Sequence, residues 1–357
     1  RPMAVDEAKP KAGLEDVVAA TSAICYLDGD RGVLAYYGHD IHDLAKGATF
    51  EETCYLLWHG RLPNRAELGD LQSQLAAARP LSEAIVRLMK QLPASDGMDM
   101  LRTLTSALGQ YDPEVNDASP QAQYRKAVRL TGQITTLTAA WSRIRKGQEA
   151  IAPRQDLTLA ANFINMLFGK EDETAAQAIN TFMVLLTEHG MNASTFVARA
   201  TVSTGSDMHS GIVSAIGTLK GPLHGGANTE AMKMFIEIGD PANVQSWFQK
   251  NIKEGDRRIM GIGHRIYKAL DPRAAVLRER AEALAKSAGN EQWFQIADQL
   301  ANTARADQYF IDRNLYPNVD YFSAIALYTL GIDVDMFTPL FAMSRMAGWT
   351  SHIIEQF

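Results

Sequence analysis

The sequence predicts a mainly α-helical protein of many helices, with at most one small β-hairpin near its N-terminus. Helix start and stop signals recur along the 357 residues, whereas strand-type patterns are confined to one short stretch. A hydrophobic fraction of 46% and a charged fraction of 21% are ordinary for a globular protein that buries a large core. The length allows two domains.

Composition excludes several classes of protein. The net charge is −6 and the lysines and arginines are scattered, so we expect no nucleic-acid partner. No apolar run has membrane-spanning length, and residues 1–13 are polar without a signal-peptide hydrophobic region. We therefore expect a loose leader over 1–13, no membrane association and a cytoplasmic protein. The cysteines, Cys25 and Cys54, fit a reducing compartment and offer no disulfide framework.

The N-terminal part holds the hairpin signal. Segments 23–27 and 33–37 flank turn-forming residues, which indicates two short antiparallel strands. Thr49 is followed three positions later by Glu52, the capping-box pattern of a helix, which we place at 43–60. Further helices are expected over residues 63–78, 81–91, 98–110, 118–146 and 157–168. Gly132, inside the longest of these, marks a kink or a point of close packing.

The next predicted helix, residues 174–189, ends in a histidine. Its apolar face carries Ile179, Phe182, Met183 and Leu186. His189 extends that face, and Gly190 ends the helix. A histidine that closes an apolar stripe is more often a core residue than a ligand-binding one, and both readings stay open here.

In the second half of the chain, residues 198–218 are rich in small side chains, which suits close helix packing or a subunit interface. Later helices are expected over residues 227–238, 242–253, 272–289, 291–313, 321–330 and 338–356. The stretch 259–268 is punctuated by glycine and is expected to be an ordered loop.

One turn combines a histidine with proline and glycine. Pro222 stiffens the chain before His224, and Gly225 and Gly226 follow where a helix begins. The positive end of a helix dipole disfavours the charged imidazole. His224 is therefore either a turn residue that caps the helix or a neutral hydrogen-bond donor to a developing oxyanion.

Two arginines occupy positions that call for an anion. Arg273 is the second residue of a predicted helix, where the dipole opposes a cation, and either Asp271 or a bound carboxylate could compensate it. Arg345 lies on the apolar face of the last helix and needs a carboxylate partner or a ligand. Asp333 and Asp335 are nearby carboxylates in sequence.

Other polar residues have plain local explanations. Asp320 precedes the helix expected from Tyr321, so N-capping is its leading local role, and His264 reads as a loop histidine. His39 and His42 form only a weak metal pattern without a third ligand at suitable spacing, so we predict no metal site. The sequence has neither a Walker A motif nor a Rossmann glycine pattern.

Taken together, these motifs resemble the citrate synthase family, in the form of its shorter bacterial and archaeal members. The resemblance covers the chain from about Gly13 and is most specific at residues 188–194, 221–226, 261–264 with 271–273, 318–320 and 344–345. It implies a multi-helical two-domain fold. The large domain would comprise 14–225 and 332–357, and the small domain, 226–331, would close over the substrates.

The resemblance also assigns roles residue by residue. Asp320 is similar to the base that deprotonates acetyl-CoA, His224 to the donor that stabilises the enolate, and His264 to the donor that polarises the oxaloacetate carbonyl. The residues implied to bind oxaloacetate or citrate are His189, Asn192, Arg273, Phe341 and Arg345. Those implied to bind CoA are Arg257, Arg258, Ile259, Gly261, Gly263 and Lys268, with a solvated charge pair as the alternative for the two arginines. No cofactor is implied, since acetyl-CoA is a substrate.

Two alternatives to a citrate synthase remain, and the family resemblance implies two further properties. A 2-methylcitrate synthase, using propionyl-CoA, would share the catalytic set, and one methylene changes pocket selectivity by only about 10–200-fold. An inactive helical scaffold is disfavoured because His224, His264 and Asp320 are all present. The family implies a homodimer with shared active sites and a partner-subunit arginine, expected beyond Phe357. No N-terminal region of the kind associated with NADH inhibition is expected.

Overall fold

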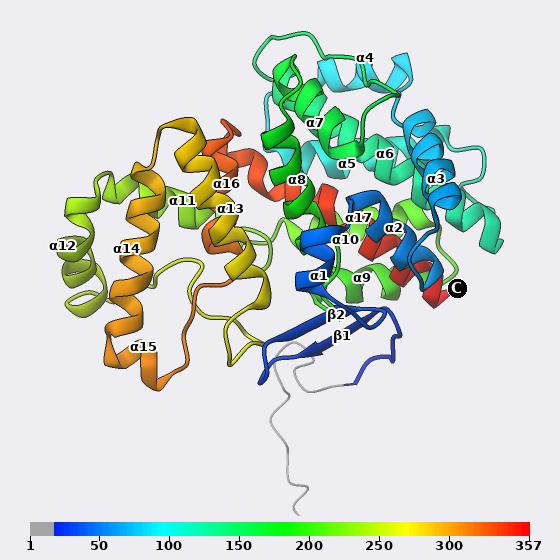
Figure 1. Ribbon diagram of the computed structural model, residues 1–357. Helices are drawn as coiled ribbons and strands as arrows, with labels where there is room; N and C mark the ends of the chain where they lie inside the picture. The colour runs from blue at the N-terminus through cyan, green and yellow to red at the C-terminus, as the bar shows by residue number, and fades with distance from the viewer. Residues whose placement is uncertain (1–17) are drawn as a thin grey trace, which may run out of the picture.

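The computed structural model describes residues 18–357, so the leader predicted at 1–13 lies outside the described residues. The predicted hairpin is confirmed as strands β1 (Cys25–Asp28) and β2 (Val33–Tyr36), which pair antiparallel with Cys25 opposite Tyr36. A two-residue strand, β3 (His39–Asp40), pairs with β2 and completes a three-stranded sheet. Figure 1 shows this sheet at one side of a helical molecule.

Helices make up most of the remaining chain. The first ten are α1 (Ile41–Gly47), α2 (Phe50–His59), α3 (Arg65–Ala78), α4 (Glu83–Gln91), α5 (Gly97–Tyr111), α6 (Pro120–Ile144), α7 (Leu159–Phe168), α8 (Glu173–Leu186), α9 (Ala193–Val202) and α10 (Met208–Leu219). The others are α11 (Ala227–Ile238), α12 (Val244–Phe248), α13 (Pro272–Ala288), α14 (Gln292–Ala306), α15 (Gln308–Asp312), α16 (Val319–Thr329) and α17 (Phe337–Gln356). The mainly α-helical fold is confirmed.

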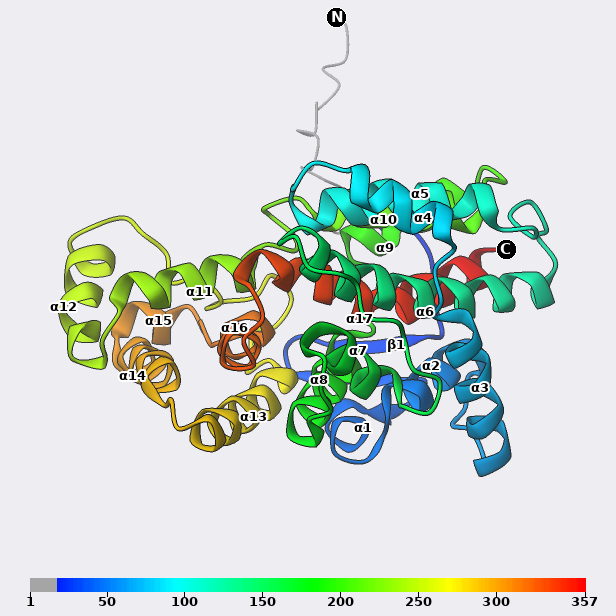
Figure 2. The same cartoon turned by 90° about the horizontal axis from the view of Figure 1, so that it is seen from above.

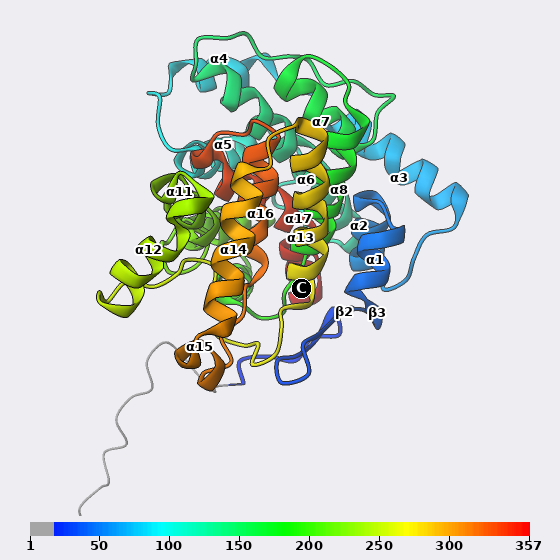
Figure 3. The same ribbon diagram turned by 60° about the vertical axis from the view of Figure 1, so that its left-hand side comes forward.

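Helix α17 lies at the centre of one group of helices. It packs against α2, α6, α8, α9 and α10. Figures 1 and 2 show it running through the middle of that group, with α11 to α16 gathered at the other side of the molecule. In Figure 3, α13, α14 and α16 lie side by side. Among residues 18–357, no helix combines the length and apolar character needed to cross a membrane.

Local signals in the N-terminal half had the predicted effect. The Thr49 side chain accepts the Glu52 backbone N–H at 3.2 Å, and the Glu52 carboxylate accepts the Thr49 N–H at 2.7 Å. The capping box therefore starts α2, and the predicted helix 43–60 is in fact two helices, α1 and α2. A Cβ on Gly132 would lie 3.2 Å from the Leu75 carbonyl oxygen of α3, so Gly132 is a point of close packing.

Three predictions at helix ends are wrong. Helix α8 ends at Leu186, so His189 follows the helix and does not extend its apolar face. Asp320 lies in the first turn of α16, whose N-cap is Asn318; the Asn318 side chain accepts the Asp320 N–H at 2.9 Å. Helix α17 begins at Phe337, one residue before the start predicted at Thr338, and has no side-chain cap.

Three stretches that the sequence analysis treated as continuous are divided into shorter elements in the structure. Residues 198–218 belong to two helices, α9 and α10, separated by a short turn. Residues 241–253 form a 3₁₀ turn, α12 and a π-helical turn, and the predicted helix 291–313 breaks before α15 at Asp307, whose side chain caps α15. Each break falls where polar side chains satisfy backbone groups locally.

Candidate active site

The six residues His189, His224, His264, Arg273, Asp320 and Arg345 come from separate parts of the fold. His189 follows α8, His224 precedes α11, and His264 lies in the loop before α13. The rings of His189 and His264 are 5.5 Å apart. Arg273 of α13, Asp320 of α16 and Arg345 of α17 are close enough for both arginines to lower the pKa of Asp320. The fold therefore gathers residues that are more than 150 positions apart in sequence.

His264 is held as a neutral hydrogen-bond donor. Its Nδ1 accepts the backbone N–H groups of Ile266 and Tyr267, each at 3.1 Å. Since Nδ1 accepts, the proton is on Nε2, which is then free to donate to another group. Burial and the charge of Arg273 lower the pKa of His264 to about 4, so the ring is neutral at physiological pH.

His224 is neutral for a related reason. Burial, followed by the charge of Arg345, lowers the pKa of His224 to about 4. The Ser194 backbone N–H points at Nε2 over 3.3 Å, and Ser194 Oγ lies 2.9 Å from the same nitrogen. Because the backbone N–H can only donate, that contact favours the tautomer of His224 with its proton on Nδ1. The N-cap of α11 is Gly226, so the predicted capping role of His224 is wrong, and burial is the leading cause of its neutrality.

Asp320 has the properties of a general base. Burial and the neighbouring Asp271 raise the pKa of Asp320 to about 6, against the opposing charges of Arg273 and Arg345. A carboxyl group with this pKa is ionised at neutral pH yet more basic than an exposed one. Its carboxylate makes no hydrogen bond with the described residues.

The two buried arginines are held differently. Arg273 forms a two-point ion pair with Asp271, Nε to Oδ1 at 3.0 Å and Nη2 to Oδ2 at 2.9 Å. Burial opposes ionisation of Asp271, but the charge and hydrogen bonds of Arg273 hold its pKa below the ordinary value. Asp271 Oδ2 also accepts the Val319 N–H at 3.1 Å, which ties the starts of α13 and α16 together.

Arg345 does not pair with the carboxylates suggested by the sequence. Asp333 and Asp335 bind Arg145 instead. Arg345 Nε donates to the Leu186 carbonyl at 2.6 Å, and its guanidinium lies 4.8 Å from the centre of the Phe341 ring. The charge of Glu188 acts on Arg345, but no carboxylate of the described residues forms an ion pair with it. A buried guanidinium of this kind is suited to binding an anionic ligand.

His189 and Asn192 complete this part of the site. Burial, with the charges of Arg273 and Arg345, lowers the pKa of His189 well below its usual range, and its Nε2 is 3.1 Å from the Tyr267 hydroxyl. Asn192 caps α9 by accepting the Thr195 N–H at 3.2 Å. Both residues line a pocket of about 370 Å³, together with residues of β1.

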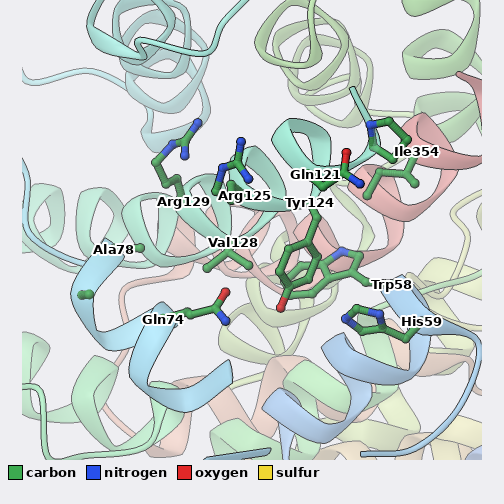
Figure 4. A pocket seen from close by; sticks show the side chains of 12 residues that line it. Trp58, His59, Gln74, Ala78, Gln121, Tyr124, Arg125, Val128, Arg129 and Ile354 are labelled. Atoms are coloured by element: carbon green, nitrogen blue, oxygen red, sulfur yellow. The ribbon is translucent and has the colours of Figure 1, made fainter. Parts of the chain in front are cut away.

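A larger pocket lies elsewhere. It has a volume of about 840 Å³ and is lined by residues of α2, α3 and α6, such as Trp58 and Tyr124 (Figure 4). Arg125 and Arg129 at its edge already bind Glu114 and Asp112. None of the candidate site residues lines it, so it is separate from the histidine and arginine cluster.

Comparison with known proteins agrees with this geometry. The family model described as citrate synthase, C-terminal domain, matches residues 13–357. Citrate synthase 2 of Bacillus subtilis is 44% identical over 97% of this chain and 91% of its own length. The chain belongs to the citrate synthase family. It is therefore related to enzymes that transfer acyl groups.

Two other matches bear on the ligands of family members. A citrate synthase of Thermoplasma acidophilum, solved as a ternary complex with carboxymethyl coenzyme A and oxaloacetate, superposes with a TM-score of 0.90 at 35% identity, over 96% of this chain and 91% of that one. A 2-methylcitrate synthase of Mycobacterium tuberculosis is 40% identical over 97% of this chain and 86% of its own length. Proteins similar to this chain thus include both citrate synthases and 2-methylcitrate synthases.

The residues for which the family resemblance implied CoA binding lie in different surroundings. Arg257 binds Glu237 at 2.6 Å and stacks on Trp247, which agrees with the charge-pair alternative. Arg258 and Lys268 are exposed and make no ion pair with residues 18–357. Ile259 is buried.

The glycines of this loop have a structural role. Gly261 has a φ of +80°, and a Cβ there would lie 2.9 Å from the Tyr321 Cα. Gly263, with a φ of +90°, donates its N–H to the Tyr316 carbonyl at 2.8 Å and accepts from the Asn318 side chain at 2.8 Å. Both glycines thus let the segment that carries His264 pack closely on the start of α16.

Sequence reasoning missed the residues that support the site. Tyr36 of β2 donates its hydroxyl to the Glu188 carbonyl at 3.0 Å, Trp349 donates to Ser194 Oγ at 3.1 Å, and Tyr267 meets His189. Their only sequence signal is an aromatic residue with a polar tip in an apolar setting, which does not reveal its partner.

Proposed function

We propose that the protein condenses acetyl-CoA with oxaloacetate and hydrolyses the resulting citryl-CoA to citrate and CoA. The observation that carries the proposal is the combination of Asp320, with a pKa of about 6, and two neutral histidines, each with a pKa of about 4. A base that is ionised and two donors that are uncharged are what enolisation of a thioester requires.

In the first step, the Asp320 carboxylate takes a proton from the acetyl methyl group. The electron pair of that C–H bond forms the enolate, whose oxygen receives a hydrogen bond from His224 Nδ1–H. A carboxylate is a weak base towards such a proton, so the enolate must be stabilised as it forms. A buried site, from which water is excluded, strengthens that hydrogen bond.

In the second step, the enolate carbon attacks the keto carbon of oxaloacetate. The keto π electrons move to oxygen, which accepts the proton of His264 Nε2 and becomes the hydroxyl of citryl-CoA. Water then attacks the thioester carbonyl and the C–S bond breaks. One proton of the water restores His264 Nε2–H, Asp320 gives its proton to the CoA sulfur, and the second water proton is released as the new carboxyl group of citrate ionises. Arg273, Arg345 and His189 bind the oxaloacetate carboxylates, since two guanidinium groups match a dicarboxylate. Phe341 supports Arg345, and Asn192 shapes the turn that follows His189.

For CoA, we propose that Arg258 and Lys268 bind phosphate groups, because both are exposed cations at the edge of the loop that carries His264. Arg257 joins them only if it leaves Glu237. Ile259, Gly261 and Gly263 contribute backbone near the adenine. We further propose that residues 226–331 close over 14–225 and 332–357, that the protein is a cytoplasmic homodimer with shared sites, and that it needs no metal or cofactor.

The test is a thiol-release assay on the purified protein. Oxaloacetate is supplied with acetyl-CoA, and free CoA is followed with a chromogenic thiol reagent. We expect release that depends on both substrates. No release from folded protein, with either acetyl-CoA or propionyl-CoA, would contradict the enzymatic function and leave the inactive scaffold.

The second candidate is a 2-methylcitrate synthase, favoured by the relative with 40% identity. The same assay with propionyl-CoA separates the two. A kcat/KM higher for propionyl-CoA than for acetyl-CoA would replace the first proposal with the second.

A further inference from the structure

A buried chain of polar side chains lies behind His189 and has no part in the steps above. It runs from Glu188, beside the site, through His352 of α17 to Arg199 of α9. His352 Nε2 is 2.9 Å from Glu188 Oε1, and His352 Nδ1 is 3.2 Å from Arg199 Nη1. Glu188 and His352 are both 0% exposed.

The direction of each hydrogen bond along this row of polar side chains is fixed. An arginine side chain can only donate, so His352 Nδ1 must accept from Arg199. His352 therefore carries its proton on Nε2 and donates it to the Glu188 carboxylate. Arg199 is held in turn by Glu355, one turn further along α17, and by Gln356 at 3.0 Å.

Glu188 also fixes the backbone around His189. Its Oε1 also accepts the Gly190 backbone N–H at 2.6 Å, so the side chain bridges across the intervening histidine. Gly190 has a φ of +63°, a conformation that bends the chain directly after His189. On the other side, the Glu188 carbonyl accepts the Tyr36 hydroxyl at 3.0 Å. The backbone on both sides of His189 is thereby fixed.

Helix α17 holds the same segment at two more points. Arg345, two turns before His352, donates to the Leu186 carbonyl at 2.6 Å. Between them, Gly348 lies so close that a Cβ would be 2.2 Å from the Thr187 carbonyl oxygen and 2.5 Å from Glu188 Oε2. One helix therefore presents Arg345 to the site and also sets the position of the segment that carries His189.

Stability alone does not explain this arrangement. Glu188 Oε2 is buried and has no hydrogen-bond partner among the described residues, which costs free energy. Replacing a buried ionic group by apolar residues of similar volume is often neutral or stabilising. The polar side chains instead tie the segment that carries His189 to the helix that carries Arg345.

We propose that Glu188 and His352 are positioning residues that set His189 relative to Arg345 and so determine the affinity for oxaloacetate. The proposal rests on the proposed function, in which these two side chains bind the same dicarboxylate. Neither Glu188 nor His352 needs to touch the substrate. Their effect is expected in oxaloacetate binding and not in acetyl-CoA recognition.

The test compares His352→Leu with His352→Gln. Leucine removes both hydrogen bonds, whereas glutamine offers an N–H donor to Glu188 and an oxygen acceptor to Arg199. Binding of oxaloacetate is measured by titration calorimetry, and KM and kcat by thiol release. For His352→Leu we expect a Kd for oxaloacetate about tenfold higher, and a KM for acetyl-CoA within about twofold of wild type. For His352→Gln we expect affinity within about threefold of wild type.

Thr350→Val is the matched control. Thr350 is buried on the same helix and its Oγ1 accepts the Trp58 indole N–H at 2.9 Å. This variant should lower Tm without changing the oxaloacetate Kd. If Thr350→Val weakens oxaloacetate binding as much as His352→Leu does, or if His352→Leu lowers only Tm, the positioning role is wrong.

Failure of the proposed function can be distinguished from failure of the positioning role. If His352→Leu does not fold, Glu188→Met takes its place, because methionine fills a similar volume but removes the oxygen that accepts from His352 and Gly190. We expect the same loss of about tenfold in affinity, and unchanged affinity would overturn the proposal. Wild-type protein that neither binds oxaloacetate nor releases CoA would contradict the proposed function itself. Active wild type with unchanged affinity in the variants would contradict the positioning role alone.

Discussion

Asp320 shows how one partly buried carboxyl group sets the pH range of the reaction. Its pKa of about 6 means that the base loses its ionised form as pH falls through that value. We expect kcat/KM for acetyl-CoA to be flat above pH 7 and to fall tenfold per pH unit below about 6. Thiol release at saturating oxaloacetate, measured across pH, tests this. A rate that stays constant down to pH 5 would argue against Asp320 as the base.

Asp320→Asn tests the same residue by a different property. Turnover should fall by about 10²–10⁴-fold, while oxaloacetate still binds, because the amide cannot accept the proton. The folded-state pKa of about 6 lies above the ordinary 3.8, so the fold favours the neutral carboxyl group. That contribution is complete below about 3.8 and is lost as pH rises through about 6.

The ionised carboxylate therefore destabilises the wild type at neutral pH, by up to about 3 kcal/mol. We expect Asp320→Asn to have the higher Tm at pH 7.5, with the difference shrinking towards pH 4. Calorimetric melting at both pH values measures it. Equal Tm values at pH 7.5 would mean that burial does not raise this pKa.

At the scale of the elements, α17 depends on a glycine for its contact with the segment after α8. A Cβ on Gly348 would lie 2.2 Å from a backbone oxygen, which cannot move aside as a flexible side chain could. We expect Gly348→Ala to destabilise the protein by about 1–3 kcal/mol and to weaken oxaloacetate binding. Chemical denaturation and calorimetry measure the two effects.

Gly69→Ala is the control for that substitution. Gly69 lies within α3, with nothing within 4 Å of the added Cβ, so alanine should stabilise the helix by about 0.5–1 kcal/mol. Should both variants be equally stable, close packing at Gly348 would not be the cause.

The sequence allowed elements with local signals to be predicted. The hairpin, the capping box at Thr49 and the Asp271–Pro272 start of α13 agree with the structure because each signal lies within a few residues. The end of α8 could not be predicted, since its C-terminal carbonyls bind Tyr36 and Arg345 from distant parts of the chain.

The active site, too, could be predicted only in part. Its residues could be named from motifs, but their protonation states could not. The neutrality of His224 results mainly from burial and Arg345, and the tautomer of His264 from two backbone N–H groups. Of the two alternatives for Arg345, pairing with Asp333 or Asp335 is excluded, because Arg145 binds both aspartates, which proximity in sequence does not reveal.

At the scale of the whole molecule, the N-terminal hairpin touches the loop that carries His264. The Gly29 carbonyl, in the β1–β2 turn, accepts the Lys268 N–H at 2.9 Å and the Ala269 N–H at 3.4 Å. A Cβ on Gly29 would lie 2.3 Å from the Ile266 carbonyl oxygen, so only glycine allows this approach. The contact joins the start of the chain to the segment between His264 and Arg273.

Gly29→Ala should therefore separate the hairpin turn from this loop. The amides of Lys268 and Ala269 would lose their acceptor, and we expect peptides covering 264–270 to exchange hydrogen at least about tenfold faster by mass spectrometry. Because the Ile266 and Tyr267 amides orient His264, kcat should fall as well. Gly47→Ala, at the end of α1 with open space around the added Cβ, is the control and should change neither quantity. Unchanged exchange in Gly29→Ala would mean that the loop keeps its conformation without the hairpin, and that His264 is positioned by its own segment alone.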